Sequence, residues 1–183
     1  MERKKYIFIA LTCLTFIPSN GQIRNTIYQA FITSNMVIWE NAIASFRPVT
    51  NDDKLELVNY LYGNIGYCLG RDQKVKAQTN LHKAEALLLQ LEIQQYQMSM
   101  IYAYKAAFVG FKIGISPYKA PFLGKESMDF AKKSVALDGK NYFGYLQLGY
   151  ITYYTPAILG GSKTDAIKYY LKALEIMEED PSD

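Results

Sequence analysis

The stretch AIKYYLKALEI, residues 166–176, decides the fold. Its apolar residues recur with the spacing of an amphipathic α-helix, which we expect to run over residues 163–179. Ala166 and Ala173 are small while Tyr170 between them is bulky, so this helix can interlock closely with a neighbouring helix. The stretch therefore predicts helices packed in pairs.

The unit that contains this stretch occurs twice, 39 residues apart. When Val109-Gly110 is set over Leu148-Gly149, the alignment continues without a gap. The residues that then coincide are Pro117 with Pro156, Ser127 with Ala166, Ser134 with Ala173, and Leu137 with Ile176. Self-similarity at this period predicts stacked helix pairs, each too small to bury its own apolar face.

The second copy resembles the tetratricopeptide repeat, a 34-residue helix–turn–helix unit that opens with W-x2-L-G-x2-Y. Tyr145 stands at the Trp position and Thr152 at the later Tyr position, and both copies carry five extra residues in the turn between their helices. A more degenerate copy lies upstream, with Tyr62-Gly63 at the Leu-Gly positions. The residues that carry the resemblance are Gly63, Ala77, Ala84, Gly110, Pro117, Ser127, Ser134, Tyr145, Leu148, Gly149, Pro156, Ala166, Tyr170 and Ala173.

The resemblance, to a divergent bacterial secreted type with long Pro/Gly turns, implies an all-α protein. We expect a right-handed α-solenoid of about three helix pairs plus an N-terminal helix. The expected helices cover residues 23–46, 52–69, 72–91, 94–114, 124–137, 141–154 and 163–179. Asn51 or Asp52 is expected to cap the second helix, and Ser162 with Asp165 the last. No stretch alternates as a strand does.

The N-terminus reads as a secretory signal peptide. Arg3, Lys4 and Lys5 precede an apolar run over residues 6–17, and the Pro18-to-Gly21 segment offers small residues for cleavage after Gly21. We therefore divide the chain into a signal peptide over 1–21, an N-terminal helix over 22–51, a repeat array over 52–179 and an acidic tail over 180–183. The protein is expected to be exported, to the periplasm or beyond.

Charge and hydropathy limit the classes of partner. The chain carries a formal net charge of +3, and removal of Arg3, Lys4, Lys5 and Glu2 with the signal lowers this to +1. No basic excess remains to bind nucleic acid through its phosphates. The 12-residue apolar run is too short to span a bilayer, so no stable membrane insertion is expected after signal removal.

The sequence contains no recognisable catalytic set, and we expect no enzyme, metal or cofactor. His82 is the only histidine, and Cys68 is the only cysteine outside the signal, so a four-ligand zinc site cannot form. Cys68 is expected to be a buried small apolar residue. The segment GGSKT at 160–164 lacks the adjacent Gly-Lys of a phosphate loop and reads as a turn with a helix cap.

Tyrosine is the remaining signal, with 16 residues in the chain. In tetratricopeptide arrays the first helix of each pair lines the concave face, and tyrosine suits such a groove because it combines a large apolar area with a polar tip. Carried over by position, the resemblance implies that a partner is bound by Tyr60, Asn64, Tyr67, Tyr104, Phe111, Phe143, Tyr150, Tyr153 and Tyr154. The alternative is that these rings only pack helix against helix.

The expected function is that of a non-catalytic adaptor or scaffold of the bacterial cell envelope, which binds a protein or peptide on a concave, tyrosine-rich face. One alternative is a glycan or small-ligand carrier, with the two long turns forming the mouth of a pocket. Another is a structural homo-oligomer, in which a second copy covers an apolar face left by the incomplete N-terminal pair.

Overall fold

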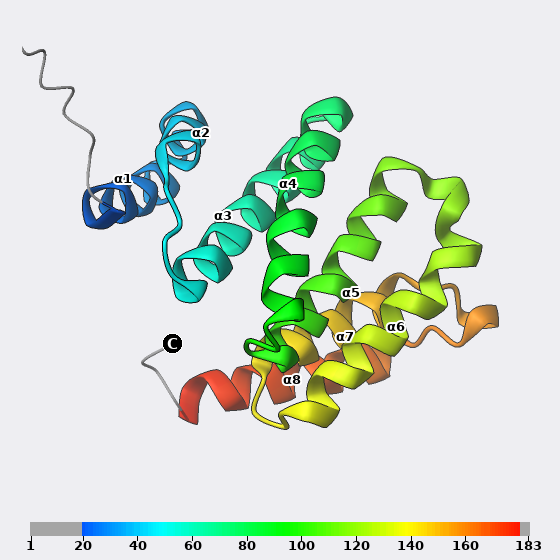
Figure 1. Cartoon of the computed structure of the whole chain (residues 1–183). Helices are drawn as coiled ribbons and strands as arrows, with labels where there is room; N and C mark the ends of the chain where they lie inside the picture. Colours follow the sequence, from blue (N-terminus) through cyan, green and yellow to red (C-terminus); the bar gives the residue numbers. More distant parts are fainter. Residues whose placement is uncertain (1–19, 180–183) are drawn as a thin grey trace, which may run out of the picture. The chain divides into compact units, whose positions relative to one another are not determined.

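The computed structural model describes residues 20–179, and all regular secondary structure in this range is helical (Figure 1). The predicted acidic tail lies outside the described residues, and so does the predicted signal peptide except for Asn20 and Gly21, which begin the first helix. The chain divides into two compact units, and the boundary in the sequence falls between Ser45 and Phe46. Among the described helices, none is long and apolar enough to cross a membrane.

The first unit is a pair of contacting helices, α1 (Asn20–Ile32) and α2 (Met36–Ser45). The expectation of one helix over 23–46 is wrong, because the backbone turns at Thr33–Asn35, where Ser34 has a φ of 54°. Thr33 Oγ1 donates to the Gln29 carbonyl (2.6 Å), and Asn35 Oδ1 accepts from the Ile38 amide (3.3 Å). Three residues with short polar side chains in succession favour such a break.

The second unit starts with α3 (Asn51–Gly70), whose cap is one residue earlier than expected. Thr50, and neither Asn51 nor Asp52, is the N-cap: its hydroxyl accepts from the Asp53 amide (3.1 Å), while Asp53 Oδ2 accepts from the Thr50 amide (3.0 Å). This reciprocal capping box satisfies two backbone donors that would otherwise have no partner within the helix.

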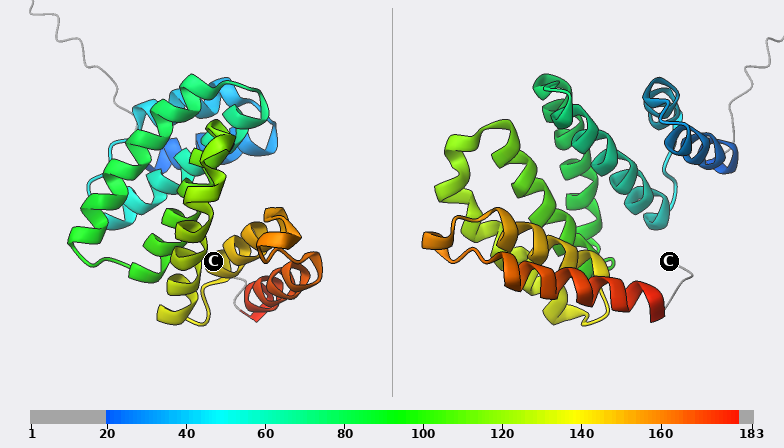
Figure 2. Two further views of the ribbon diagram at one scale, coloured as in Figure 1. Left: turned by 90° about the vertical axis from the view of Figure 1, so that its right-hand side faces the viewer. Right: turned by 180° about the vertical axis from the view of Figure 1, so that it is seen from behind.

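The six helices of the second unit form three pairs. The pairs are α3 with α4 (Lys74–Ile93), α5 (Met98–Ile115) with α6 (Ala120–Leu137), and α7 (Tyr142–Tyr154) with α8 (Lys163–Glu179). The second helix of each pair contacts the first helix of the next, and α5 also contacts both α3 and α7. Figure 2 shows the pairs following one another from α3 to α8. The first helices thus lie side by side.

Small residues of the repeat lie where helices pack most closely. Ala77, Ala84, Ala166 and Ala173 are fully buried, and Ser127 Oγ donates to the Ala106 carbonyl across α5 and α6 (2.8 Å). Ser127 and Ser134 of α6 are buried, as are Ala166 and Ala173 of α8, which indicates that the 39-residue register aligns equivalent packing positions in the last two pairs.

The signature glycines Gly110 and Gly149 differ. A Cβ on Gly149 would collide with the ring of Tyr170, so α7 and α8 can approach this closely only with glycine here. A Cβ on Gly110, at the equivalent position of the preceding pair, would meet no atom within 4 Å. Of these two pairs, only the last therefore depends on its glycine for close approach.

The long turns are shorter than expected because each contains helical residues. Each first helix ends at the same repeat position, Ile115 or Tyr154, and a 3-10 turn follows, η1 (Pro117–Lys119) or η2 (Ala157–Leu159). After η1 the chain continues directly into α6 at Ala120, whereas the sequence predicted a start at residue 124. Pro117 and Pro121 do not prevent this, since both stand in a first helical turn, where the missing N–H has no intrahelical partner.

The second turn requires its glycines. Gly160 has a φ of 93°, and a Cβ on Gly161 would collide with the Thr155 carbonyl. Ser162 Oγ then accepts from the Asp165 amide (3.1 Å), which confirms the predicted cap of α8. The glycine pair allows a sharp return that brings α8 back along α7.

Three further helix ends differ from the sequence expectation. The helix α4 runs from residue 74 to 93, two residues later than predicted at both ends. The helix α5 starts at Met98, four residues later than predicted, because Gln95 and Gln97 have positive φ values of 54° and 42°.

Cys68 is fully buried, as expected.

Candidate functional site

Aromatic rings from the first helices gather into one cluster, which we call the aromatic face and define as Tyr62, Tyr104, Phe111, Phe143 and Tyr150. The ring of Tyr62 on α3 lies 5.2 Å from that of Phe111 on α5 and 5.3 Å from that of Phe143 on α7. Tyr104 and Phe143 approach to 4.8 Å. These contacts across three pairs bring together rings that are up to 81 positions apart.

The inner part of the aromatic face serves packing. Tyr104 and Phe143 are buried, and Tyr62 and Phe111 are half-buried. Tilted and edge-to-face ring contacts such as these stabilise helix interfaces. For Tyr104 and Phe143, the alternative that the rings only pack helix against helix therefore describes the structure better than the partner-binding prediction.

Three other predicted site residues lie apart from the aromatic face. Asn64 is 1% exposed and accepts from Asn80 Nδ2 (2.7 Å), so its prediction as a groove residue is wrong: the side chain turns towards α4, not to an accessible surface. Tyr60 packs against Phe46 (5.9 Å between centroids), and Tyr67 lies against the guanidinium of Arg71.

Burial alters the acidity of the rings. The pKa of Tyr104 is raised well above its usual value of 10.0, chiefly by desolvation, and its hydroxyl donates to Asn59 Oδ1 (3.0 Å). The pKa of Tyr62 is also raised by burial and by the nearby Tyr150, and the Gln147 amide offsets part of this. Both shifts favour the neutral phenol at Tyr62 and Tyr104.

Gln147 is the one residue beside the aromatic face with a buried amide that is left unsatisfied. Its side chain is 4% exposed, and Nε2 makes no well-formed hydrogen bond within the described residues, although the amide lies near the Tyr62 hydroxyl. A buried polar group in this state is an exception in folded proteins and calls for a reason.

The exposed part of the site is a row on α7, which we call the tyrosine ridge: Tyr150, Tyr153 and Tyr154. These side chains remain 44%, 41% and 77% exposed. Tyr150 packs on Tyr170 of α8 (5.6 Å), and Tyr153 packs on Tyr154 (5.0 Å). Since Tyr150 also neighbours Tyr62, the ridge is continuous with the aromatic face. The structure thus brings the three α7 tyrosines of the prediction together on an accessible surface.

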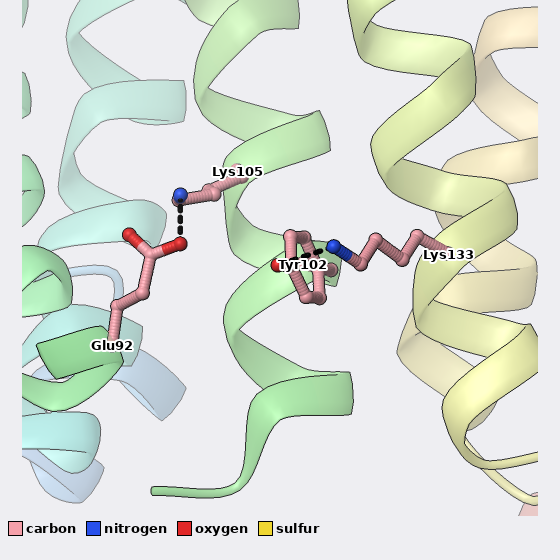
Figure 3. A network of polar contacts seen from close by, with 4 residues as sticks. All are labelled: Glu92, Tyr102, Lys105 and Lys133. Carbon is pink, nitrogen blue, oxygen red and sulfur yellow. Dashed lines mark hydrogen bonds and ion pairs between the residues drawn. The ribbon is translucent and has the colours of Figure 1, made fainter. Parts of the chain in front are cut away.

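A separate cleft of about 220 Å³ lies over α5, between α4 and α6. Two of its lining residues, Lys105 and Glu92, form an ion pair (2.5 Å), and next to Lys105 the Lys133 ammonium donates to the Tyr102 hydroxyl (2.6 Å), as Figure 3 shows. Lys133 Nζ also lies 4.1 Å from the centroid of the Tyr102 ring. These contacts connect α4, α5 and α6, which gives the network a structural role.

A second cleft, of about 550 Å³, adjoins the first and shares Glu85 and Lys112, which form an ion pair (2.6 Å). Lys119 and Phe122 from the first long turn line this cleft, together with His82. Residues 156–161 of the second long turn line neither cleft. These two clefts therefore do not match the alternative in which both long turns form the mouth of a pocket. Over residues 20–179 no group of His, Cys, Asp and Glu could hold a metal ion.

The sequence analysis did not identify Tyr62 as a member of the aromatic face, because it assigned Tyr62 to the repeat's Leu position. A helical-wheel projection that placed Tyr62 on the same face as Phe111 and Phe143 would have found it, because all three lie on first helices.

The sequence matches no family model, and neither curated proteins nor solved structures give a match. The site therefore rests on its own residues.

Proposed function

We propose that residues 51–179 form a tetratricopeptide-like α-solenoid that acts as a non-catalytic adaptor, binding a protein or peptide partner through the tyrosine ridge. In this proposal the protein is exported to the bacterial cell envelope, which the N-terminal sequence supports. The solenoid interpretation is supported by the three successive helix pairs and by the burial of the repeat alanines in each pair.

The observation that carries the binding proposal is the exposure of the tyrosine ridge. Three tyrosines on adjacent turns of α7 leave large ring areas in solvent, beside a half-buried aromatic face. Tyrosine is enriched at the energetic centres of protein interfaces, because it buries a large area while few side-chain torsions lose their freedom. Contiguous exposed apolar surface of this kind marks interaction sites.

The chemistry of the site favours an apolar or aromatic segment with some free backbone polar groups. The ridge and the aromatic face consist of Tyr and Phe side chains, and Lys163 Nζ lies 5.4 Å from the centroid of the Tyr153 ring, so most of the surface offered to a peptide is aromatic. The hydroxyl groups of Tyr150, Tyr153 and Tyr154 can donate hydrogen bonds to carbonyl oxygens of a bound backbone. A preformed helical surface also loses little entropy on binding.

The test is a cross-linking pull-down from envelope extract with the wild type and a Tyr153→Ala, Tyr154→Ala variant. This pair is preferable to one that includes Tyr150, because Tyr150 packs on Tyr170 whereas Tyr153 and Tyr154 pack on each other. A matched control, Tyr118→Ala, removes a ring that is 74% exposed on η1.

The proposal predicts one protein retained by the wild type and by Tyr118→Ala but lost with the double variant. If the double variant retains the same protein as the wild type, the ridge is not the binding surface. If nothing is enriched with any of the three proteins, the adaptor function is contradicted and small-ligand binding at the clefts beside α4 becomes the better hypothesis.

A further inference from the structure

The outer face of α8 is apolar and uncovered within the second unit. Ile167, Leu171, Leu174 and Met177 are 55%, 60%, 51% and 46% exposed, and the positions 167, 171 and 174 follow the i, i+4, i+7 spacing of one helix face. The opposite face, which includes Ala166, Ala173 and Ile176, is buried against α7. Figure 2 shows α8, coloured orange-red to red, as the helix at the outer edge of the second unit, next to α7.

The charges of α8 are ordered along its length. The N-terminal part carries Lys163, Lys168 and Lys172, with Asp165 as the only acidic residue, and the C-terminal part carries Glu175, Glu178 and Glu179 with no basic residue in the last turn. This order opposes the helix dipole, which favours acidic residues at the N-terminus and basic residues at the C-terminus. This charge order therefore does not stabilise α8 as an isolated helix.

The same order is self-complementary. A two-fold axis perpendicular to α8 sets two copies of the helix antiparallel, so that each basic half faces an acidic half. Lys163 and Glu178 are equidistant in sequence from the midpoint between Ile167 and Leu174. One axis through that midpoint therefore stacks the apolar residues of the two stripes and places Lys163 of each copy opposite Glu178 of the other.

The local contacts leave these end charges available. Lys168 is paired with Asp165 (2.7 Å) and Lys172 with Glu175 (3.1 Å) inside the helix. Lys163 Nζ lies 5.4 Å from the centroid of the Tyr153 ring, and both Lys163 and Glu178 are exposed. Their charges can therefore pair across an interface without breaking an ion pair within α8.

We propose that the outer face of α8 is a homodimer interface, in which two copies of the chain pack their α8 helices antiparallel around the apolar stripe Ile167, Leu171 and Leu174. The stripe supplies the attraction through apolar burial, while the opposed charge halves set the orientation. This interface is distinct from the tyrosine ridge on α7, so that a dimer can form whether or not the ridge binds a partner.

The test is sedimentation analysis of the full chain over a wide concentration range, with a thiol reductant present so that Cys13 and Cys68 cannot cross-link copies. The mass should rise with concentration from that of the 20.9 kDa monomer to twice that value. Leu171→Glu should leave a monomer at every concentration, because it puts a charge at the centre of the stripe. Leu89→Glu, which changes a leucine of similar exposure on α4, should leave the dimer unchanged.

Charge reversal tests the orientation. Lys163→Glu or Glu178→Lys alone should weaken the dimer roughly three- to thirtyfold, since each change disrupts two symmetry-related pairs. The double variant should recover the affinity. Both substitutions improve the match to the helix dipole, so a weaker dimer cannot be attributed to a less stable α8.

A wild type that stays monomeric throughout overturns the proposal. A dimer that survives Leu171→Glu shows that the interface lies elsewhere and overturns it equally. If the single reversals weaken the dimer but the double variant does not recover, the antiparallel arrangement is wrong. The wild-type and Leu171→Glu outcomes involve neither Tyr153 nor Tyr154, so failure there is separable from failure of the adaptor function. Lys163→Glu also removes the contact of Lys163 with the Tyr153 ring, so Glu178→Lys is the cleaner of the two single reversals.

Discussion

Gly149 is the residue at which the last helix pair is most sensitive to size. Because a Cβ at this position would meet the Tyr170 ring, Gly149→Ala should lower the free energy of unfolding by about 1–3 kcal/mol. Gly110→Ala is the matched control at the equivalent repeat position, where a Cβ meets no atom within 4 Å.

Gly110→Ala should raise the free energy of unfolding by about 0.5–1 kcal/mol, since alanine restricts the unfolded chain and favours helix. Urea unfolding of the two variants beside the wild type measures both changes. Equal effects at the two glycines would show that α7 and α8 do not approach as closely as described.

Tyr104 should make the protein sensitive to alkali. Burial raises its pKa in the folded state above the unfolded value near 10, so the associated stability is fully present below pH 10 and is lost as the pH rises further. Tyr104→Phe removes the ionisable group, and the variant should lose less stability than the wild type between pH 10 and 12, measured by urea unfolding. Tyr118→Phe, an exposed ring, is the control and should behave as the wild type does.

Individual site residues could be predicted from the sequence only in part. Tyr150, Tyr153 and Tyr154 were found because α7 matches the repeat well enough to give a helix register. Asn64 was assigned to the wrong face because the repeat register was also applied to the most degenerate pair. A register error of one residue there turns a side chain from an exposed face of α3 to the interface with α4. Burial of a polar residue such as Gln147 depends on neighbours that a single sequence does not reveal.

At the scale of elements, the cap of α3 gives a direct prediction. Thr50→Ala removes one side of the capping box and should destabilise the protein by about 1 kcal/mol. Gln73→Ala is the matched control, because Gln73 is the N-cap of the partner helix α4 and its side chain makes no capping bond. Thermal unfolding should show a lower midpoint for Thr50→Ala alone; equal shifts for both would contradict the assigned cap.

Most elements of the second unit were predictable, because apolar periodicity and the Pro and Gly signals act within a few residues of each boundary. Two of the breaks that were missed have the same cause. Neither the turn at Gln95–Gln97 nor, in the first unit, the turn at Thr33–Asn35 contains a glycine or proline that would mark it in the sequence. Helix continuation across residues 120–123 was missed because Pro121 reads as a terminator unless the helix start is already known.

At the scale of the whole molecule, the all-helical class follows from the 39-residue period and the lack of strand alternation, and the described residues confirm it. The arrangement of the helix pairs depends on small rotations between neighbours, which the sequence pattern does not encode. The charge order of α8 illustrates a further gap: it is visible in the sequence, but its meaning emerges only when the exposed stripe beside it is known.

The most direct test of the central claim, that the tyrosine ridge binds a partner protein, is site-specific photo-cross-linking in the native host. A photoreactive phenylalanine analogue would replace Tyr154 in one variant and Tyr118 in the other, two exposed rings in different parts of the second unit. The adaptor function predicts one discrete cross-linked partner from position 154 and none from position 118. The absence of an adduct at 154, or the same adducts from both positions, would contradict it.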